Sequence, residues 1–334
     1  MSTAEYIPYF LEDIENHGRN ARTIDAYRRV LDTFERFLRE ERAKTPATAE
    51  YRDCMAFVHS LRSEYSESTI ASYASYLNRF YGYLVRVGQL DSNPMELVLE
   101  EMNEKIDTNP SRRDLSIDQM REFVAEIHHP LHRAVMLTLL KTGIRSGELC
   151  NLDLADLHLD HPSMEWNPRA QVASKPDSIF VSVDHTHGRE SGGEVRLDSN
   201  KRQRETLIPV DSELRASLIR WLAIRPDSMS PAEPLFVGTS DKWGERLTIN
   251  QVHHIVESYA RPRGWYRNGG GAPENVTPHY FRHFFTTHLR DRTGDRGIVK
   301  YLRGDVADDI IDTYTHDWNE RVREIYLDHI YSLT

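Results

Sequence analysis

The residues best suited to chemistry lie close to the C-terminus, where a helix is expected to begin. Thr277 and Pro278 are residue types that occupy the N-cap and the first position of a helix, which places His279 and Arg282 on one face near its start. The unpaired N–H groups and the dipole at this end of a helix favour an anion, and a phosphate is the obvious candidate. Tyr314 follows 32 residues after Arg282. A tyrosine alone is most often a core aromatic, so its pairing with an anion site is what singles it out.

Two further segments carry charged residues that would suit the same site. Arg145 and Glu148 lie three residues apart in Thr-Gly-Ile-Arg-Ser-Gly-Glu-Leu, residues 142–149, and therefore share a helix face. Alone, such a pair would be a surface ion pair of little worth. Lys201 lies in an expected hairpin ahead of Leu-Ile-Pro at residues 207–209. A lone lysine in a hairpin is usually just solvated, so its interpretation depends on the other segments.

Together, these segments resemble the signature boxes of the tyrosine recombinase, or phage integrase, family. The boxes are residues 142–149, His279-x-x-Arg282-His283 and Tyr314-Thr-His316, in the family's order and with its spacing from Arg282 to Tyr314. Each box alone is a weak pattern, but all of them in order argue against a chance match. The resemblance extends over nearly the whole chain. It implies a site-specific recombinase or integrase that cleaves and rejoins double-stranded DNA.

The family's chemistry needs a nucleophile, cations on the two non-bridging phosphate oxygens, and an acid for the departing 5′ oxygen. The resemblance makes Tyr314 the nucleophile that forms a 3′-phosphotyrosine. This ester conserves the bond energy, so a second 5′-hydroxyl reverses the step without ATP. The phosphate clamp would be Arg145 and Arg282, because a planar guanidinium binds phosphate through two donors, which lysine does not. No residue in this set calls for a metal or any other cofactor.

The resemblance also assigns the proton transfers. His279 would act as a general acid or base, and Lys201 would protonate the leaving oxygen. Registering the chain on the Leu-Ile-Pro that follows puts the family's catalytic lysine at Lys201, and Lys175 is the competing candidate. Glu148 would orient Arg145 or His279 from behind as a supporting carboxylate.

One site position departs from the family pattern. Tyr301-Leu-Arg-Gly-Asp305 occupies the place of the family's Leu-x-Gly-His box, where histidine or tryptophan is usual. A histidine there would donate a hydrogen bond to the phosphate, whereas an ionised aspartate would repel it. Asp305, counted as the sixth site residue, is therefore expected to be protonated, turned away, or bonded to a neighbour such as Arg303. Arg303 or His316 is the candidate for the missing donor.

Three other functions are left open by the sequence. A type IB topoisomerase shares the chemistry but would act as a monomeric clamp. A catalytically impaired, integrase-like DNA-binding protein is favoured by Asp305 and by the acidic charge of the chain. A metal hydrolase would use His279, His283 and His288, but these fall at i, i+4 and i+9. His288 would thus lie off the face of the other two, and no carboxylate at ligand spacing completes the set.

The overall charge is unusual for a protein that binds DNA. The chain of 334 residues has a formal net charge of −10, whereas phosphate contacts normally require a basic surface. Among its 42 basic residues, 7 are lysine and 35 are arginine. An acidic, Arg-rich and Lys-poor composition is typical of proteins from a high-salt cytoplasm, where salt screens self-repulsion. We therefore expect a halophilic archaeon as the source, with the basic groups gathered in one cleft; an ordinary acidic surface is the alternative.

No segment of the sequence indicates a membrane protein or an exported one. The longest clear apolar run, residues 134–140, is far shorter than a membrane span. Residues 1–13 are acidic and interrupted by Pro8, unlike a signal peptide. The protein is therefore expected in the cytoplasm. Cys54 and Cys150 are too few for a disulfide framework or a zinc site and are interpreted as free thiols.

The elements that position the site are expected in two domains, the first of them helical. Residues 1–103 show four segments with apolar residues at helical spacing, the second behind a cap at Thr23, and such helices bury one shared core. Asn93-Pro94 is expected at its boundary, with residues 104–112 as the linker. The resemblance makes residues 1–103 the SAM-like core-binding domain, which contacts DNA. Its candidate phosphate contacts are exposed arginines, which on residue type alone more often form a solvated face: Arg19, Arg22, Arg28 and Arg29.

The second domain, residues 113–334, is expected to be the α+β catalytic domain, so that the whole chain is mostly helical with a small sheet. Helices are predicted behind the capping residues Ser116, Asp211, Thr248 and Thr277, and from Pro130 to a left-handed Gly143. The predicted strands are residues 178–183, 195–197 and 205–210. Within this β region, His185 and His187 are expected to be exposed loop residues rather than metal ligands.

The resemblance also implies the partners. They are double-stranded DNA and further copies of the chain, two on each crossover site and four in the synapse. Accessory DNA-bending proteins are further candidates, and the gene would belong to a mobile element. The final segment, residues 320–331, has helical periodicity and is expected to dock on a neighbouring protomer.

Overall fold

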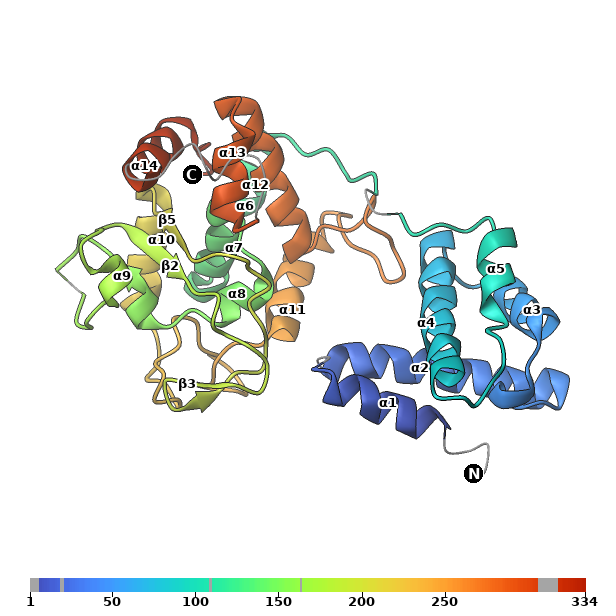
Figure 1. The fold of residues 1–334 in the computed structure, drawn as a ribbon. Helices are drawn as coiled ribbons and strands as arrows, with labels where there is room; N and C mark the ends of the chain where they lie inside the picture. The colour runs from blue at the N-terminus through green and yellow to red at the C-terminus, as the bar shows by residue number, and fades with distance from the viewer. Residues whose placement is uncertain (1–5, 19–20, 108–109, 163, 306–317) are drawn as a thin grey trace. The chain divides into compact units, whose positions relative to one another are not determined.

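A computed structural model of the chain describes residues 6–18, 21–107, 110–162, 164–305 and 318–334. Backbone contacts divide the chain into two units, Met1–Pro110 and Ser111–Thr334. The division falls inside the segment predicted as a linker, residues 104–112. Both units are drawn in Figure 1, and each is described by itself.

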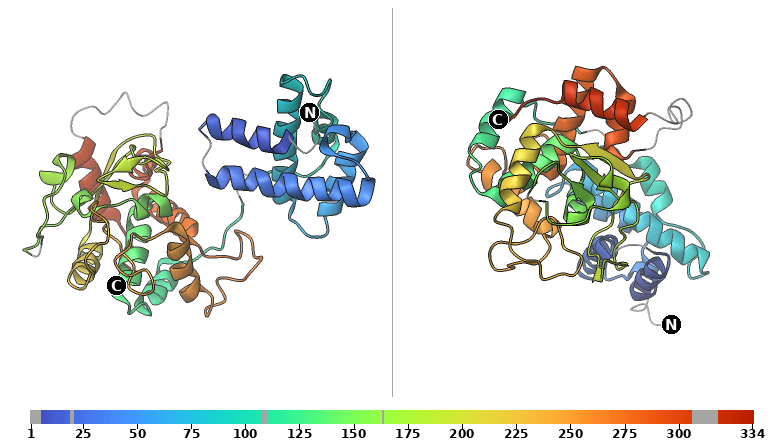
Figure 2. Two further views of the ribbon diagram at one scale, coloured as in Figure 1. Left: turned by 90° about the horizontal axis from the view of Figure 1, so that it is seen from below. Right: turned by 90° about the vertical axis from the view of Figure 1, so that its left-hand side faces the viewer.

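The amino-terminal unit is helical throughout its described residues. Its helices are α1 (Tyr6–Asn16), α2 (Ala21–Phe37, continued by a π-helical turn at Leu38–Arg42), α3 (Tyr51–Leu61), α4 (Glu67–Arg86) and α5 (Met95–Glu101), with a 3₁₀ turn at Pro46–Thr48. The first two helices lie side by side, and α4 packs against α1, α2, α3 and α5 (Figure 2). The apolar faces meet in one core, where Leu31, Phe34 and Phe80 have no exposed surface. The predicted helical bundle is confirmed.

Two local predictions for this unit are wrong. Thr23 lies within α2 instead of capping it, because the helix already begins at Ala21. Pro94 does not end the domain but is the N-cap of α5, which buries Met95 and Val98 in the same core. Asn93 supports that start, since its side-chain oxygen accepts a 2.9 Å hydrogen bond from the Met95 backbone N–H.

The carboxy-terminal unit combines helices with small antiparallel sheets. Its helices are α6 (Ile117–Ala125), α7 (Pro130–Thr142), α8 (Ser146–Cys150), α9 (Ala170–Ala173), α10 (Ser212–Leu222), α11 (Ile249–Ala260), α12 (Pro278–Thr293), α13 (Arg296–Arg303) and α14 (Trp318–His329). Its strands are β1 (Leu157–His158), β2 (Ser178–Val181), β3 (Glu190–Ser191), β4 (Glu194–Val195) and β5 (Thr206–Pro209). The larger sheet has the order β1-β2-β5, and Ser178 pairs with Pro209 at one end of its long pair. The mostly helical fold with a small sheet is thus confirmed.

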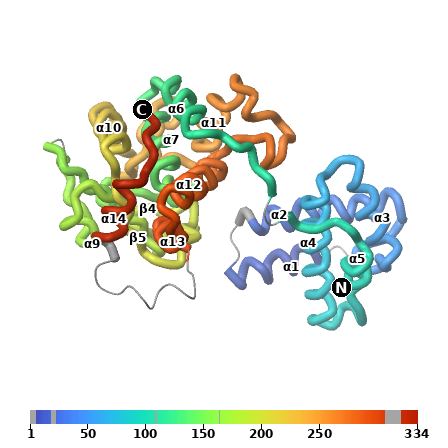
Figure 3. The backbone as a smooth tube through the Cα atoms, turned by 90° about the horizontal axis from the view of Figure 1, so that it is seen from above, coloured from blue at the N-terminus to red at the C-terminus, as the bar shows by residue number. Residues whose placement is uncertain are grey.

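Helix α7 lies at the centre of this unit and packs against α6, α8, α10, α11 and α12. Its apolar run is buried from Ala134 to Leu140, as a helix surrounded by others must be. Helix α12 packs against α7, α11, α13 and α14, and Figure 3 shows α12 and α13 next to one another. The start of α12 and the turn after α7 are therefore held in the same region of the core.

The helix boundaries follow the predicted capping residues. Thr277 accepts a hydrogen bond from the Tyr280 N–H at the start of α12, with Pro278 at its first position. Gly143 ends α7 with φ +64°, and Ser116, Asp211 and Thr248 cap α6, α10 and α11. These signals succeed because a cap depends on residues close in the sequence.

Helix α14 and the residues after it pack on their own unit. Helix α14 contacts α12 and β5, and the Tyr326 hydroxyl donates a 2.8 Å hydrogen bond to the Lys141 carbonyl. Tyr331 and Leu333 are buried, with the Leu333 N–H donating to Glu213 at 2.9 Å. Apolar residues of this segment complete the core around α7, and its docking on a neighbouring protomer stays a prediction.

Two of the remaining predictions for the whole chain can be compared with the structure. Cys54 and Cys150 are free, as predicted. Both are also buried, and burial raises the pKa of both thiols, that of Cys54 to about 12. Among the described helices, none has the length and apolar character needed to cross a bilayer.

Candidate active site

Arg145 is positioned by a tight turn between α7 and α8. The turn needs glycine at residue 143, because φ is +64° and a Cβ there would lie 2.2 Å from the ring of Phe285. Arg145 then forms the N-cap of α8, and its backbone N–H donates a 2.9 Å hydrogen bond to Glu148 Oε2. Its guanidinium Nη1 donates to the other oxygen, Oε1, at 3.0 Å. Glu148 therefore fixes both the backbone and the side chain of Arg145.

Arg282 reaches the same place from the second turn of α12. Its side chain is only 3% exposed, and its Nη1 donates a 2.6 Å hydrogen bond to the Gly143 carbonyl. Its Nη2 donates to the carbonyl of Arg303 at 3.2 Å, which ties it to the end of α13. Arg282 thus joins the turn that carries Arg145 to the end of the helix that precedes Asp305.

Asp305 lies within ion-pair distance of three arginines, and Arg145 and Arg282 donate hydrogen bonds to it. Its Oδ1 lies 3.2 Å from Arg145 Nη2 and 3.0 Å from Arg282 Nη2, while its Oδ2 lies 2.9 Å from Arg303 Nε. Asp305 was expected to be protonated, turned away, or bonded to a neighbour such as Arg303. The structure shows it bonded, with Arg145 and Arg282 as partners in addition to Arg303. The carboxylate occupies the point on which the guanidiniums of Arg145 and Arg282 converge.

The site has an excess of positive charge that the carboxylates only partly offset. Burial, and then the nearby Arg145 and Arg303, lower the pKa of Arg282 to about 9 despite the opposing effect of Asp305. Burial alone would raise the pKa of Glu148, but the charges of Arg202 and Arg145 and the Arg145 N–H lower it below its ordinary value. Both groups therefore remain charged at neutral pH, and the surplus favours a further anion.

His279 lies one position after Pro278 at the start of α12 and is exposed. Partial shielding from water, followed by the guanidiniums of Arg112, Arg282 and Arg145, lowers the pKa of its imidazole. A neutral ring at physiological pH is able to accept a proton from a nearby group. His279 and Arg282 therefore share a helix end, as predicted, with the histidine open to solvent and the arginine buried.

Lys201 lies in the segment that connects β4 to β5. Its side chain is exposed, and among the described residues it has no hydrogen-bond or ion-pair partner. The competing Lys175 is engaged elsewhere, because its ammonium pairs with Glu320 at the start of α14. The structure thus leaves Lys201 available to a substrate, whereas Lys175 is held by a carboxylate.

Arg202 was not singled out by the sequence, although it is part of the same site. Its guanidinium is fully buried and pairs with the equally buried Glu148, with 3.2 Å between Nη2 and Oε2. Its Nη1 donates to the Leu302 carbonyl at 3.2 Å. No sequence signal marks this role, because Arg202 and Glu148 are 54 residues apart and belong to different elements.

Tyr314 and His316 lie outside the described residues, as do all residues from 306 to 317. The described chain stops at Asp305, directly after the left-handed Gly304 that ends α13, and resumes at Trp318. Among the predicted site residues, the structure therefore brings together Arg145, Glu148, Arg282 and Asp305. The position of the predicted nucleophile is not part of this geometry.

The prediction that His185 is an exposed loop residue is wrong. Its side chain is buried beside Asp153 and Asp156, and both ring nitrogens lack a hydrogen-bond partner among the described residues. Burial, and then the nearby Arg196, lower the pKa of the imidazole to about 4. The His185 backbone is also tied down, because its carbonyl accepts a 2.8 Å hydrogen bond from the Asn200 backbone N–H. His187 is exposed, as predicted.

His185, Asp153 and Asp156 are also close enough for their ligand atoms to surround one ion, all lying within 4.8 Å of one another. The local charges argue against a metal. The oxygens of Asp153 already accept from three guanidiniums, and Asp156 pairs with one of the three; these are Arg169, Arg196 and Arg246. A divalent cation would have to displace paired cations from a cluster they already neutralise.

The geometry does not support the metal-hydrolase alternative. His288 is directed to the Leu115 carbonyl, with 3.1 Å between Nε2 and the oxygen. Within the described parts of the chain, the group that includes His185 is the one set of three or more potential ligands at metal-binding distances, and His279 is not in it.

For the arginines predicted to contact phosphate in the amino-terminal unit, the side chains of Arg28 and Arg29 are exposed, whereas those of Arg19 and Arg22 are not described.

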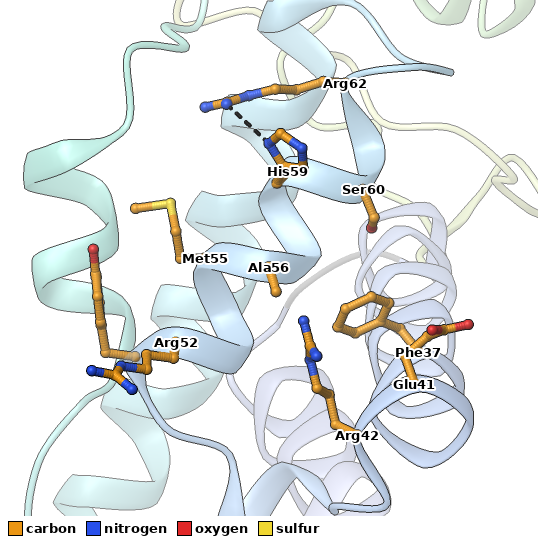
Figure 4. Close-up of a pocket in the computed structure, with 10 residues that line it drawn as sticks. Phe37, Glu41, Arg42, Arg52, Met55, Ala56, His59, Ser60 and Arg62 are labelled. Carbon is orange, nitrogen blue, oxygen red and sulfur yellow. Dashed lines mark hydrogen bonds between the residues drawn. The ribbon is translucent and has the colours of Figure 1, made fainter.

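A separate hollow lies in the amino-terminal unit, between the end of α2 and α3 (Figure 4). It measures about 500 Å³ and is lined by Phe37, Met55 and Ala56 with basic groups beside them. One of these, Arg62, contacts His59 Nδ1 at 3.3 Å and pairs with Glu104. None of the predicted catalytic residues lines this hollow.

The chain matches two family descriptions. Residues 7–88 match the phage integrase N-terminal SAM-like domain, and residues 180–321 match the phage integrase family. Together they cover more than half of the chain, and the second range contains Lys201, Arg282 and Tyr314. The chain therefore belongs to the tyrosine recombinase (phage integrase) family, a class of enzymes that carry out site-specific DNA recombination.

Particular relatives resemble it along their whole length. The tyrosine recombinase XerC of Thermodesulfovibrio yellowstonii is 26% identical over 338 residues, which cover 97% of this chain and 96% of that protein. The tyrosine recombinase XerD of Listeria innocua is 26% identical over 321 residues, covering 94% of each. These alignments thus extend over both units of the chain.

Solved structures share the fold at lower identity. The Tn1549 transposon integrase in complex with transposon right end DNA superposes with a TM-score of 0.66 at 20% identity, covering 98% of this chain and all of that one. A lambda integrase (75–356) dimer bound to a COC′ core site gives a TM-score of 0.65 at 15% identity, covering 93% and 97%. These likenesses establish the architecture of both units.

Proposed function

We propose that this recombinase breaks and rejoins DNA through a 3′-phosphotyrosine at Tyr314, with Arg145 and Arg282 as the phosphate clamp. The observation that carries the proposal is the convergence of two guanidiniums on one oxygen. Arg145 Nη2 and Arg282 Nη2 come from different helices and lie 3.2 and 3.0 Å from Asp305 Oδ1. A non-bridging oxygen of a phosphodiester has the same charge and accepts the same donors, so it fits where the carboxylate oxygen lies.

The proposed reaction balances without an added cofactor. The Tyr314 phenol oxygen forms a bond to phosphorus as the bond from phosphorus to the 5′ oxygen breaks. The phenol proton passes to a base, for which the neutral imidazole of His279 is suited, and Lys201 gives a proton to the departing 5′ oxygen. The arginines stabilise the extra negative charge on the phosphoryl oxygens in the transition state. Attack by a 5′-hydroxyl of a second strand reverses each change.

The test is covalent trapping on a nicked DNA that carries the attachment site of the chain's own element. Loss of a short 5′-hydroxyl fragment makes cleavage irreversible, so adduct accumulates on a denaturing gel. The wild type is expected to form it in the presence of a chelator, whereas Tyr314→Phe binds the same DNA without an adduct. Adduct formation by Tyr314→Phe would refute the nucleophile.

A second candidate function is supported by the contacts of Asp305. An integrase-like protein that binds DNA without cutting it would have no need of an open clamp, and here the carboxylate occupies it. Retained DNA binding without adduct from the wild type would favour this function. A type IB topoisomerase is distinguished by a strand-exchange assay, because a topoisomerase would relax supercoils without exchanging strands.

The proposed partners and setting extend the same reasoning. We infer double-stranded DNA as the substrate, two protomers on each crossover site and four in the synapse, because the structural relatives include a DNA-bound dimer and a tetramer on a Holliday junction. We further infer a mobile element in a halophilic archaeon, acting in the cytoplasm with DNA-bending accessory proteins. The Lys-poor, acidic composition supports the high-salt setting. The test of the high-salt setting is to measure DNA cleavage as a function of potassium chloride concentration. A requirement for molar salt would support it.

A further inference from the structure

Arg202 is a buried cation next to an exposed lysine. The side chains of Arg202 and Glu148 both have 0% exposure, and their ion pair measures 3.2 Å. Burial lowers the pKa of the Arg202 guanidinium, and the charge of Glu148 opposes that shift. Removing two charges from water costs several kcal/mol per ion, which good geometry and further hydrogen bonds must offset. A buried arginine in a connecting segment therefore needs a role beyond filling space.

Arg202 connects the Lys201 segment to the end of α13. Its Nη1 donates to the Leu302 carbonyl at 3.2 Å, and the next residue, Gln203, donates its backbone N–H to the Gly304 carbonyl at 3.3 Å. Gly304 has φ +69°, and a Cβ there would lie 2.5 Å from Arg202 Cγ. The close approach of the two segments thus depends on glycine at 304 and fixes the backbone just after Lys201.

The same side chain connects the segment to the clamp. Glu148 Oε2 accepts from both Arg202 Nη2 and the backbone N–H of Arg145, while Oε1 accepts from Arg145 Nη1. A shift of the Arg202 guanidinium would therefore be felt by Arg145 through one shared carboxylate.

A second anchor holds the other side of Lys201. The Asn200 side chain donates to the Ser182 carbonyl at 2.8 Å and accepts from Asn151 Nδ2 at 2.9 Å. Lys201 is thus an exposed residue between two buried, hydrogen-bonded neighbours. Its backbone is held on both sides, while its side chain is exposed and has no partner among the described residues.

We infer that Arg202 is a positioning residue for proton delivery: through Glu148 it holds Lys201 in register with the arginine clamp, so that the lysine reaches the leaving 5′ oxygen. This inference rests on the proposed function. It predicts that a change at Arg202 impairs the protonation of the leaving group more than it impairs the binding or polarisation of the phosphate. A purely structural arginine would give no such selectivity.

The experiment compares two nicked trapping substrates that differ in one atom. One has the normal 5′ oxygen at the scissile phosphate and the other has sulfur there. A thiolate leaves without being protonated, because a thiol has a pKa of about 8.5. A defect in the proton donor is therefore relieved by sulfur, whereas a defect in the clamp is not.

The variants are Arg202→Lys, which keeps the charge but loses the forked contact, and Arg202→Gln. Single-turnover rates of adduct formation on the oxygen substrate are expected to fall on the order of 10²-fold, the size of a general-acid contribution. On sulfur DNA the rates should return to within several-fold of the wild type. Lys201→Ala should behave in the same way, and Arg145→Lys should be slow on both substrates.

Arg204→Lys is the matched control. It lies two residues further along the same segment, and its guanidinium lies over the Tyr301 ring at 4.5 Å instead of contacting Glu148. Its rates should stay near those of the wild type on both substrates. Gel-shift binding and melting temperature, measured for every variant, show that the folded protein is being compared.

Three outcomes would overturn the inference. The first is an Arg202→Lys defect of equal size on oxygen and sulfur, which would place Arg202 with the clamp or the fold. The second is wild-type rates from both Arg202 variants. The third is wild-type protein that forms no adduct on either DNA. This outcome refutes the proposed function itself, and it is told apart from the first two because the wild type alone shows it.

Discussion

Arg282 Nη1 donates a 2.6 Å hydrogen bond to the carbonyl oxygen of Gly143. The donor belongs to α12, and the acceptor is the residue that ends α7 and leads into Arg145. This contact therefore joins the two segments that carry Arg145 and Arg282. The steric environment of Gly143 is equally restricted, since Phe285 of α12 leaves no room for a Cβ.

Gly143→Ala should therefore separate the two clamp arginines. The left-handed backbone alone costs about 1–2 kcal/mol for a residue other than glycine, and the overlap with Phe285 adds to this. Gly294→Ala is the matched control, because Gly294 ends α12 with φ +66° and, among the described residues, has no atom within 4 Å of the added Cβ. Urea unfolding should show a larger loss for Gly143→Ala, together with loss of adduct formation. Equal losses in stability would show that the overlap is relieved without cost.

Arg145→Lys and Arg282→Lys should both reduce cleavage by about 10²–10³-fold, the usual effect of removing one donor from a charged transition state. Lysine keeps the charge but loses the planar pair of donors. Single-turnover trapping measures the rate, and gel shift measures DNA binding, which should change little. Arg290→Lys is the control on α12, because Arg290 is exposed and pairs only with its neighbour Asp291 among the described residues. Wild-type rates from either clamp variant would refute the assignment.

Asp305→Asn should increase the affinity of the clamp for phosphate. The substitution removes the charge that competes for Arg145 and Arg282, and it leaves these arginines and Arg303 unneutralised. Stability at low salt should fall by about 1–2 kcal/mol, because the ion pairs are only partly exposed. Added sulfate should raise the melting temperature of this variant more than that of the wild type.

The matched control for Asp305 is Asp291→Asn, which breaks a surface pair on α12. It should show little change in stability and no extra response to sulfate. If sulfate raised the melting temperature of Asp305→Asn by no more than that of the wild type, the proposal that the Asp305 carboxylate occupies an anion site would be contradicted. Asp305→His restores the residue type usual in the family and should also raise the rate of adduct formation.

The pH dependence of cleavage should reflect the lowered pKa of His279. An ordinary histidine loses its neutral form as the pH falls through about 6.5. Here shielding and the neighbouring arginines lower the pKa, so the neutral form persists further into acid. The rate of adduct formation should therefore hold as the pH falls through 6.5 and decline only below it. His279→Asn should lower the rate and remove this acid decline; a decline above 6.5 in the wild type would contradict the assignment.

The sequence by itself determined the features that depend on neighbouring residues. Thr277 and Pro278 start α12, and Gly143 ends α7, because capping and left-handed turns are decided within a few residues. The spacing of apolar residues likewise predicted the helical amino-terminal unit and the small sheet. The ordered boxes around Arg145, Arg282 and Tyr314 pointed to the family, since a motif is a property of the chain alone.

Only the tertiary structure decided how the charges are paired. Asp305 contacts Arg145 across 160 residues of sequence, and Arg202 contacts Glu148 across 54. The inward fold of His185 and the anchoring of Tyr331 on α7 also depend on distant segments. An ion pair forms where packing brings two side chains within a few ångströms and excludes water, and neither condition is encoded in local spacing. The sequence therefore named the two arginines of the proposed clamp, and the fold determined which carboxylate lies between them and which buried arginine supports them.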